Sequence, residues 1–176
     1  MEHAQEITPL FTAEEIASRV RALAGEIRTD AGPGEIFYLG ILKGSALFLA
    51  DLLRATPGDV GYGFIDVIRD MADNTTADAL EIDFLSFTDI RGRNVYVLKD
   101  VVTSGIIETY LLGQLRMHHP RSLRLVALLD KREARTTDLE TDFRAFEITD
   151  GATYAGYGLE KSARFGNLPY IGRTTG

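Results

Sequence analysis

The chain alternates between stretches with helical and with strand-like hydrophobic patterns. From Thr12 onward, one stripe of apolar residues recurs at helical spacing: Ile16, Val20, Leu23 and Ile27. Thr12 and Glu15 have the spacing of a capping box, which predicts that the helix begins at Thr12. The glycine- and proline-containing stretch 31–34 predicts its end.

Short apolar runs predict buried strands between further helices. The predicted strands are 35–42, 60–67, 80–87, 94–98 and 122–129, the predicted helices are 46–54 and 106–118, and the predicted loops are 68–79 and 100–105. Alternating strands and helices imply an α/β fold, with a mainly parallel sheet covered by helices on both faces. Ligands bind such sheets beyond the carboxyl ends of the strands. We therefore expect the segments 42–44, 98–105 and 129–131 to meet at one cleft.

Composition narrows the class of protein. The 176 residues are enough for a single domain, 1–176, and 45% hydrophobic with 26% charged residues is typical of a globular chain. The net charge of −7 argues against nucleic acid as a partner, and the chain has no apolar run of about 18 residues that would span a membrane. The lack of cysteine excludes disulfides, thiolate metal sites and cysteine nucleophiles. Together with a polar N-terminus unlike a secretory signal, it favours the cytoplasm.

Polar residues at the predicted strand ends carry the candidate chemistry. Lys43, before the permissive Gly44, can meet a phosphate as a point charge. Asp100 can accept hydrogen bonds from sugar hydroxyls or meet a hydrated magnesium ion. The stretch 103–105 precedes a helix, where backbone N–H groups can hold a phosphate, and Lys131 can donate to a ligand carbonyl. Taken singly, each is equally compatible with a solvated residue in a surface turn.

Aromatic residues near the C-terminus are candidates for stacking on a flat heterocycle. They are Tyr154, Tyr157 and Phe165. Packing in the core is the commoner role of such side chains. The adjacent pair His118 and His119 is a poor metal site, because neighbouring side chains on a helix do not face the same way.

Several segments together resemble hypoxanthine-guanine phosphoribosyltransferases. They are 39–54 (LGILKGSALFLADLLR), 88–95 (TDIRGRNV), 128–132 (LLDKR), 156–159 (GYGL) and 167–172 (NLPYIG). The resemblance runs from about Thr12 to Gly172. It implies the type I phosphoribosyltransferase fold, a mainly parallel twisted sheet flanked by helices, with a small hood and a mobile loop at 68–79. It also implies a homodimer or a homotetramer.

The resemblance further implies transfer of a phosphoribosyl group from phosphoribosyl diphosphate to a purine base, with magnesium. Its positions for the diphosphate and the 5′-phosphate fall on Leu42, Lys43, Gly44, Ser104, Gly105, Ile106 and Ile107, and Arg164 is the nearest substitute for an arginine that is missing at Gly166. The positions for ribose, the purine oxygen and magnesium fall on Asp100, Lys131 and the pair Asp100 with Glu160, where Glu160 replaces an aspartate. The stacking ring is displaced by an extra residue in 150–156, and Tyr154 is its nearest substitute.

The departures from the family fall on the reacting centre. Lys99 stands where the first member of an acidic pair is expected, and Thr103 replaces the acid that handles the purine proton. An ammonium cannot accept a hydrogen bond from a hydroxyl, and threonine is a poor general base. Three interpretations stay open. The chain is a transferase whose catalytic positions are Asp100, Thr103 and Lys99, an enzyme for another reaction on a nucleotide or purine-like compound, or a non-catalytic nucleotide-binding protein.

Overall fold

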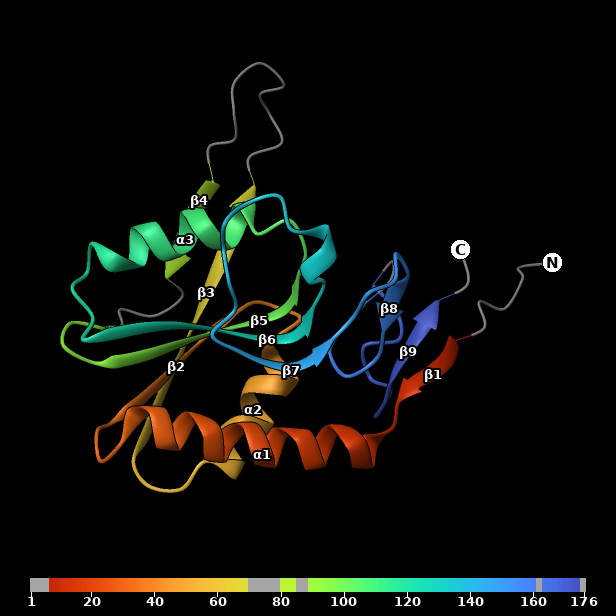
Figure 1. Ribbon diagram of the computed structural model, residues 1–176, viewed down its shortest axis with the longest axis horizontal. Helices are drawn as coiled ribbons and strands as arrows, with labels where there is room; N and C mark the ends of the chain where they lie inside the picture. The colour runs from red at the N-terminus through yellow and green to blue at the C-terminus, as the bar shows by residue number, and fades with distance from the viewer. Residues whose placement is uncertain (1–6, 70–79, 85–88, 161–162, 175–176) are drawn as a thin grey trace, which may run out of the picture.

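A twisted sheet with the strand order β4-β3-β2-β5-β6-β7 lies at the centre of the computed structural model (Figure 1). The structure describes residues 7–69, 80–84, 89–160 and 163–174. The strands are β2 (Ile36–Ile41), β3 (Val60–Arg69), β4 (Leu80–Phe84), β5 (Asn94–Val102), β6 (Ser122–Asp130) and β7 (Phe143–Glu147). All neighbours pair in parallel except β3 and β4. The predicted α/β fold with a mainly parallel sheet is confirmed.

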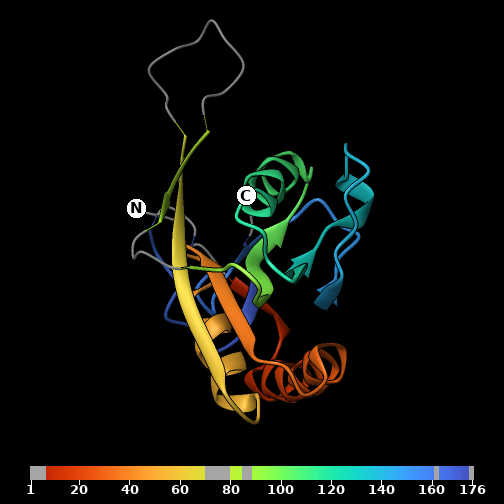
Figure 2. The same ribbon diagram turned by 90° about the vertical axis from the view of Figure 1, so that its left-hand side faces the viewer.

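Helices cover both faces of this sheet. Figures 1 and 2 show α1 (Ala13–Ala31) and α2 (Ala46–Ala55) on one side and α3 (Ile106–Arg116) on the other. Successive strand residues point to opposite faces, so Tyr38 packs in the core beneath α1 and α2, whereas Phe37 packs in the core beneath α3. Within the described part of the chain, no helix is long and apolar enough to cross a membrane.

The predicted start of α1 is confirmed atom by atom. The Thr12 hydroxyl accepts a hydrogen bond from the Glu15 backbone N–H at 3.2 Å, and the Glu15 carboxylate accepts one from the Thr12 N–H at 2.8 Å. The buried side of the helix is the predicted apolar stripe, which comprises Ile16, Val20, Leu23 and Ile27. This burial against α2 and the sheet, rather than the cap alone, holds the helix in place.

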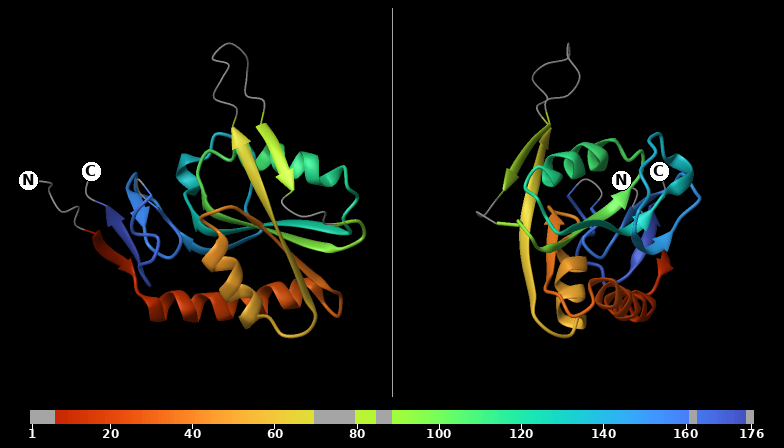
Figure 3. Two further views of the ribbon diagram at one scale, coloured as in Figure 1. Left: turned by 180° about the vertical axis from the view of Figure 1, so that it is seen from behind. Right: turned by 60° about the vertical axis from the view of Figure 1, so that its left-hand side comes forward.

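A small antiparallel sheet, here termed the hood, stands beside the main sheet (Figure 3). Its order is β1-β9-β8, with β1 (Ile7–Phe11), β8 (Thr153–Ala155) and β9 (Ile171–Thr174). Phe11 stacks on Phe146 of β7 with ring centroids 3.9 Å apart, so the hood is fastened to the edge of the main sheet. Ile171 and Tyr154 also join the core under α1 and α2.

Several predicted boundaries were wrong. The segment 100–105 was expected to be a loop, but β5 continues to Val102 because parallel pairing with β6 extends to Asp130. Likewise β3 runs to Arg69, past the predicted loop start at Ile68, because it pairs with β4. The remainder of the predicted mobile loop, 70–79, lies outside the described residues.

Candidate active site

A cavity of about 260 Å³ lies beyond the carboxyl ends of β5 and β6, between the main sheet and the hood. Its lining includes four residues predicted for ribose, base, stacking and metal, namely Asp100, Lys131, Tyr154 and Glu160. The other lining residues are Val101, Ala152, Thr153 and Leu159. The predicted meeting of strand ends is therefore confirmed for β5 and β6. A larger cavity of about 490 Å³ lies between α3 and residues 137–139, and it contains none of the predicted site residues.

Lys131 joins the main sheet to the hood across this cavity. Its backbone N–H donates to the Val102 carbonyl at 2.9 Å, which fixes the residue at the end of β6. Its Nζ donates to the Ala152 carbonyl at 2.6 Å and lies 4.8 Å from the centroid of the Tyr154 ring. The ammonium has three N–H donors, and the Ala152 carbonyl takes one of them, so the others can reach a ligand carbonyl in the cavity.

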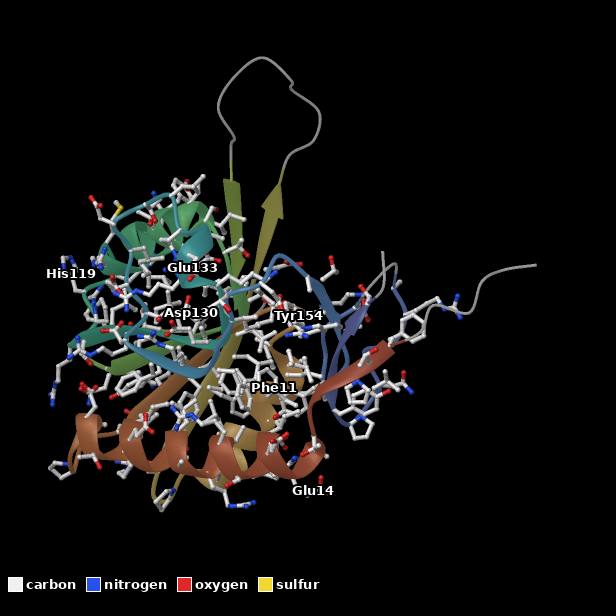
Figure 4. All side chains as sticks on the ribbon, turned by 45° about the vertical axis from the view of Figure 1, so that its right-hand side comes forward. Phe11, Glu14, His119, Asp130, Glu133 and Tyr154 are labelled. Atoms are coloured by element: carbon white, nitrogen blue, oxygen red, sulfur yellow. The ribbon has the colours of Figure 1, made fainter. Side chains whose placement is uncertain are left out.

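Tyr154 is the C-terminal aromatic that both packs in the core and lines the cavity. Its side chain belongs to the core, yet it also lines the cavity, and Figure 4 shows it on the side of the molecule where the hood meets the main sheet. Its hydroxyl donates to Asp150, and burial together with that carboxylate raises the pKa of Tyr154 to about 12. The ring is therefore neutral at physiological pH. Tyr157 instead packs in the core and donates to Asp51 at 2.6 Å.

The segment after β2 reaches the cavity through Gly44. The peptide bond between Leu42 and Lys43 is cis. A Cβ atom at Gly44 would lie 2.0 Å from Oδ2 of Asp100, so only glycine lets the backbone pass this close to that carboxylate. Asp100 Oδ1 accepts from the Val101 N–H at 2.8 Å. The predicted diphosphate segment and the predicted ribose residue are thus in direct contact.

Both carboxylates predicted to meet magnesium are already in ion pairs. Asp100 Oδ1 lies 2.8 Å from Lys99 Nζ, and Glu160 Oε2 lies 2.6 Å from Lys43 Nζ. No group of three or more histidine and acidic side chains is arranged to hold a metal among residues 7–69, 80–84, 89–160 and 163–174. A metal ion at either carboxylate has to compete with an ammonium for its charge. The residues present therefore do not fit a magnesium ion held by the protein.

The stretch predicted to hold the 5′-phosphate lies apart from the residues that line the cavity. Thr103 is exposed, and Ser104 Oγ accepts from the Ile106 N–H at 3.4 Å. Gly105, at φ +83°, immediately precedes α3, and a Cβ there would lie 2.5 Å from Thr137 Oγ1. Ile107 is half-buried. The first turn of α3 thus starts with a glycine whose conformation side chains rarely adopt.

A buried carboxylate that the sequence did not single out braces this stretch. Asp130, at the end of β6, is only 1% exposed. It accepts from Thr141 Oγ1 at 2.5 Å and pairs with Arg135, whose Nε donates to the Thr103 carbonyl at 3.0 Å. Arg144 Nε lies 3.7 Å from the same carboxylate. Figure 4 shows Asp130 beside the segment that carries Glu133.

Glu108 is a second buried acid that the sequence did not single out. It lies in the first turn of α3 and is 4% exposed. Burial raises the pKa of Glu108, although its own backbone N–H and then Lys99 oppose the shift, while Asp100 adds to it. Its proximity to Lys99 and Asp100 couples it electrostatically to the ribose end of the site.

Replacing Glu108 with glutamine should stabilise the protein at neutral and alkaline pH. The pKa of the Glu108 carboxyl is higher in the folded protein than in the unfolded chain. The stability that this carboxyl contributes is therefore complete below its unfolded pKa, and it is lost as the pH rises through its folded pKa. Thermal melting of Glu108→Gln should exceed that of the parent near about pH 8, and the difference should vanish toward about pH 4. A variant less stable than the parent at alkaline pH would contradict the assignment. Glu133→Gln, at an exposed position, is the matched control.

Arg164 does not reach the cavity. Its guanidinium lies 5.1 Å from the Phe165 ring centroid, and the side chain is exposed. Gly166 packs against Glu160, since a Cβ there would lie 3.0 Å from Glu160 Cγ. The role of Arg164 toward a diphosphate therefore stays a prediction.

Comparison with known proteins agrees with this arrangement of strands and site. The family model for the phosphoribosyl transferase domain matches residues 7–160, so the chain belongs to the phosphoribosyltransferase domain family. Within it, the hypoxanthine-guanine phosphoribosyltransferase of Bacillus subtilis is 33% identical over 165 residues, which cover 93% of this chain and 90% of the relative. That of Mycobacterium avium is 34% identical over 169 residues, covering 93% and 83%.

Solved structures give the same result. A hypoxanthine-guanine phosphoribosyltransferase from Bacillus anthracis superposes with a TM-score of 0.85 at 32% identity, covering 97% of this chain and 99% of that one. The hypoxanthine phosphoribosyltransferase of Trypanosoma cruzi, in a ternary substrates complex, superposes with a TM-score of 0.87 at 29% identity, covering 97% and 96%. The resemblance inferred from the sequence motifs is therefore confirmed at the level of family and fold.

Proposed function

We propose that this chain transfers the 5-phosphoribosyl group from phosphoribosyl diphosphate to a purine base of the hypoxanthine or guanine type, and releases pyrophosphate. The observation that supports this most directly is the cavity itself, which places Asp100, Lys131 and Tyr154 around one space between the sheet and the hood. Those are the residue types that ribose hydroxyls, a purine oxygen and a purine ring require.

Each residue then has a defined task. Lys131 donates from Nζ to the exocyclic oxygen of the base, whose ring lies against Tyr154. Asp100 accepts hydrogen bonds from the ribose hydroxyls, and Lys43 binds the diphosphate as a point charge. The backbone N–H groups of 104–107, at the start of α3, hold the 5′-phosphate.

The bond changes follow from these positions. A purine ring nitrogen attacks the anomeric carbon as the bond to the diphosphate breaks, and the bonding electrons leave with pyrophosphate. The proton of the attacking nitrogen passes to solvent, because the hydroxyl of Thr103 does not titrate near neutral pH. The rate of the transfer step then depends on how the substrates are positioned and on electrostatic stabilisation of the sugar cation.

The test is a turnover assay with phosphoribosyl diphosphate and hypoxanthine, guanine or xanthine in turn. Formation of a nucleoside monophosphate and pyrophosphate in equal amounts is the expected result. Introducing a base with Thr103→Asp should raise kcat by about 10²-fold or more, since general bases contribute about 10²–10⁴-fold. Lys131→Met should abolish the preference among bases. Absence of any nucleotide product with all three bases would sink the proposal.

A second candidate rests on Lys99 and Thr103. With both motif acids replaced, the same scaffold is suited to another reaction on a nucleotide or purine-like compound, or to binding a nucleotide without turnover. The double variant Lys99→Glu with Thr103→Asp separates the candidates. It raises transferase activity if the first function is right, and it abolishes the native activity if the protein has been repurposed.

We propose that the reaction takes place in the cytoplasm, in keeping with the chain's lack of cysteine, and that a single domain spanning 1–176 carries it out. A homodimer or homotetramer is the assembly that we expect. Light scattering of the purified protein measures it.

A further inference from the structure

Lys99 precedes Asp100, which lines the cavity, and its ammonium forms a partly enclosed ion pair with the Asp100 carboxylate. Nζ and Oδ1 are 2.8 Å apart, and the two side chains are 20% and 22% exposed. An ion pair at this depth is screened by solvent and salt less than a surface pair. Lys99 is therefore a fixed positive charge beside the residue that is proposed to bind ribose.

The second carboxylate of the site is neutralised in the same way. Glu160, from the segment after β8, pairs with Lys43 at 2.6 Å, although the Lys43 side chain is 71% exposed. Two ammonium groups and two carboxylates give this quartet a formal charge of zero. A divalent cation is bound in proteins by carboxylates together with substrate phosphates. Here the carboxylates carry no surplus negative charge to attract one.

We infer that the ammonium of Lys99, with that of Lys43, takes the place of a divalent cation, so that the protein binds phosphoribosyl diphosphate without magnesium. This inference rests on the proposed function. Lys99 keeps one N–H on Asp100 and directs its other donors to ligand oxygens, which an ammonium on a four-carbon stem can do. The fixed charge then offsets the negative charge of the diphosphate before and during its departure.

The experiment is calorimetric titration of phosphoribosyl diphosphate into the full chain, once with excess chelator and once with magnesium chloride. We expect the dissociation constants of the parent protein to agree within roughly threefold, a difference well under the 1.4 kcal/mol that corresponds to tenfold. Lys99→Gln should bind at least about tenfold more weakly in chelator. Lys99→Glu, which restores an acidic pair with Asp100, should bind only when magnesium is present.

Arg91→Gln provides the matched control, because it removes one positive charge from an exposed turn away from the cavity. It should leave both dissociation constants unchanged, and melting curves of all variants should overlay that of the parent. This inference alone is overturned if the parent protein binds phosphoribosyl diphosphate only with magnesium. It is also overturned if Lys99→Gln binds phosphoribosyl diphosphate in chelator as tightly as the parent does. Absence of binding in both conditions, together with absence of turnover, overturns the proposed function and this inference with it.

Discussion

Replacing Asp130 with alanine should lower the free energy of unfolding by about 3–5 kcal/mol, the cost of breaking a buried ion pair from one side. The carboxylate is 1% exposed, and the Arg135 side chain that it pairs with is 9% exposed. Without it, the guanidinium of Arg135 is left without its buried counter-charge, and the hydroxyl of Thr141 loses its acceptor. At about 2–4 °C per kcal/mol for a chain of this size, the melting temperature should fall by roughly 6–20 °C.

The same substitution should also weaken the grip on the 5′-phosphate. Arg135 holds the Thr103 carbonyl through Nε, and its position depends on Asp130. We expect KM for phosphoribosyl diphosphate to rise in Asp130→Ala at a temperature where the variant is folded. Glu133→Gln, which removes an exposed acid from the same segment, should change neither quantity. A loss of stability below about 1 kcal/mol, the range of surface ion pairs, would show that Asp130 is not an anchor.

Replacing Gly44 with alanine should reduce kcat/KM for phosphoribosyl diphosphate by about 10²-fold, the scale of a misplacement of about 1 Å in an active site. The new methyl group would lie 2.0 Å from Oδ2, 2.7 Å from Cγ and 3.0 Å from Cβ of Asp100. Rotation of the Asp100 side chain moves Oδ2 and Cγ, but Cβ is fixed to β5 and stays in a tight contact at 3.0 Å. Asp100 must therefore leave Lys99, or the segment after β2 must move out of the cavity.

Steady-state kinetics with varied phosphoribosyl diphosphate measure this effect. The matched control is Gly25→Ala in α1, where a Cβ meets nothing within 4 Å. It should leave kcat/KM unchanged and raise stability by about 0.5–1 kcal/mol, the helix preference of alanine over glycine. Equal kinetics for Gly44→Ala and the parent would mean that the Asp100 carboxylate is not held in its place by the glycine.

Local patterns were sufficient for the parts of the fold that depend on local structure. The capping box at Thr12 and the apolar runs of β2 and β6 predicted their elements. A helix leaves an apolar stripe at helical spacing, and burial on both faces of a parallel sheet leaves a continuous apolar run. The three strands of the hood were not predicted. The strand β1, Ile7–Phe11, is short and contains no fully buried residue, and its partner β9 lies far away in the sequence. Its stability comes from pairing, which no local window contains.

The same distinction applies to the site. Placing Lys131 and Asp100 near one another follows from parallel topology, since both stand at carboxyl ends of neighbouring strands. The partners of these residues could not be predicted in the same way. Ala152 and Glu160 reach the cavity from the segments around the hood, and the burial of Asp130 depends on Arg135 folding back across its own strand end. The family resemblance supplied positions but not these ion pairs.

The pairing of β1 with β9 sets an order of events during synthesis. Ile7 lies opposite Thr174, so the first described strand to leave the ribosome has to wait for the last one before it can pair. Closing a contact of such sequence separation costs loop entropy and slows folding. Tyr154 lies in β8, opposite Arg173 of β9. The strand that carries the proposed stacking ring is therefore paired only after β9 has been made. Until β9 has been made, the hood lacks the strand that joins β1 to β8.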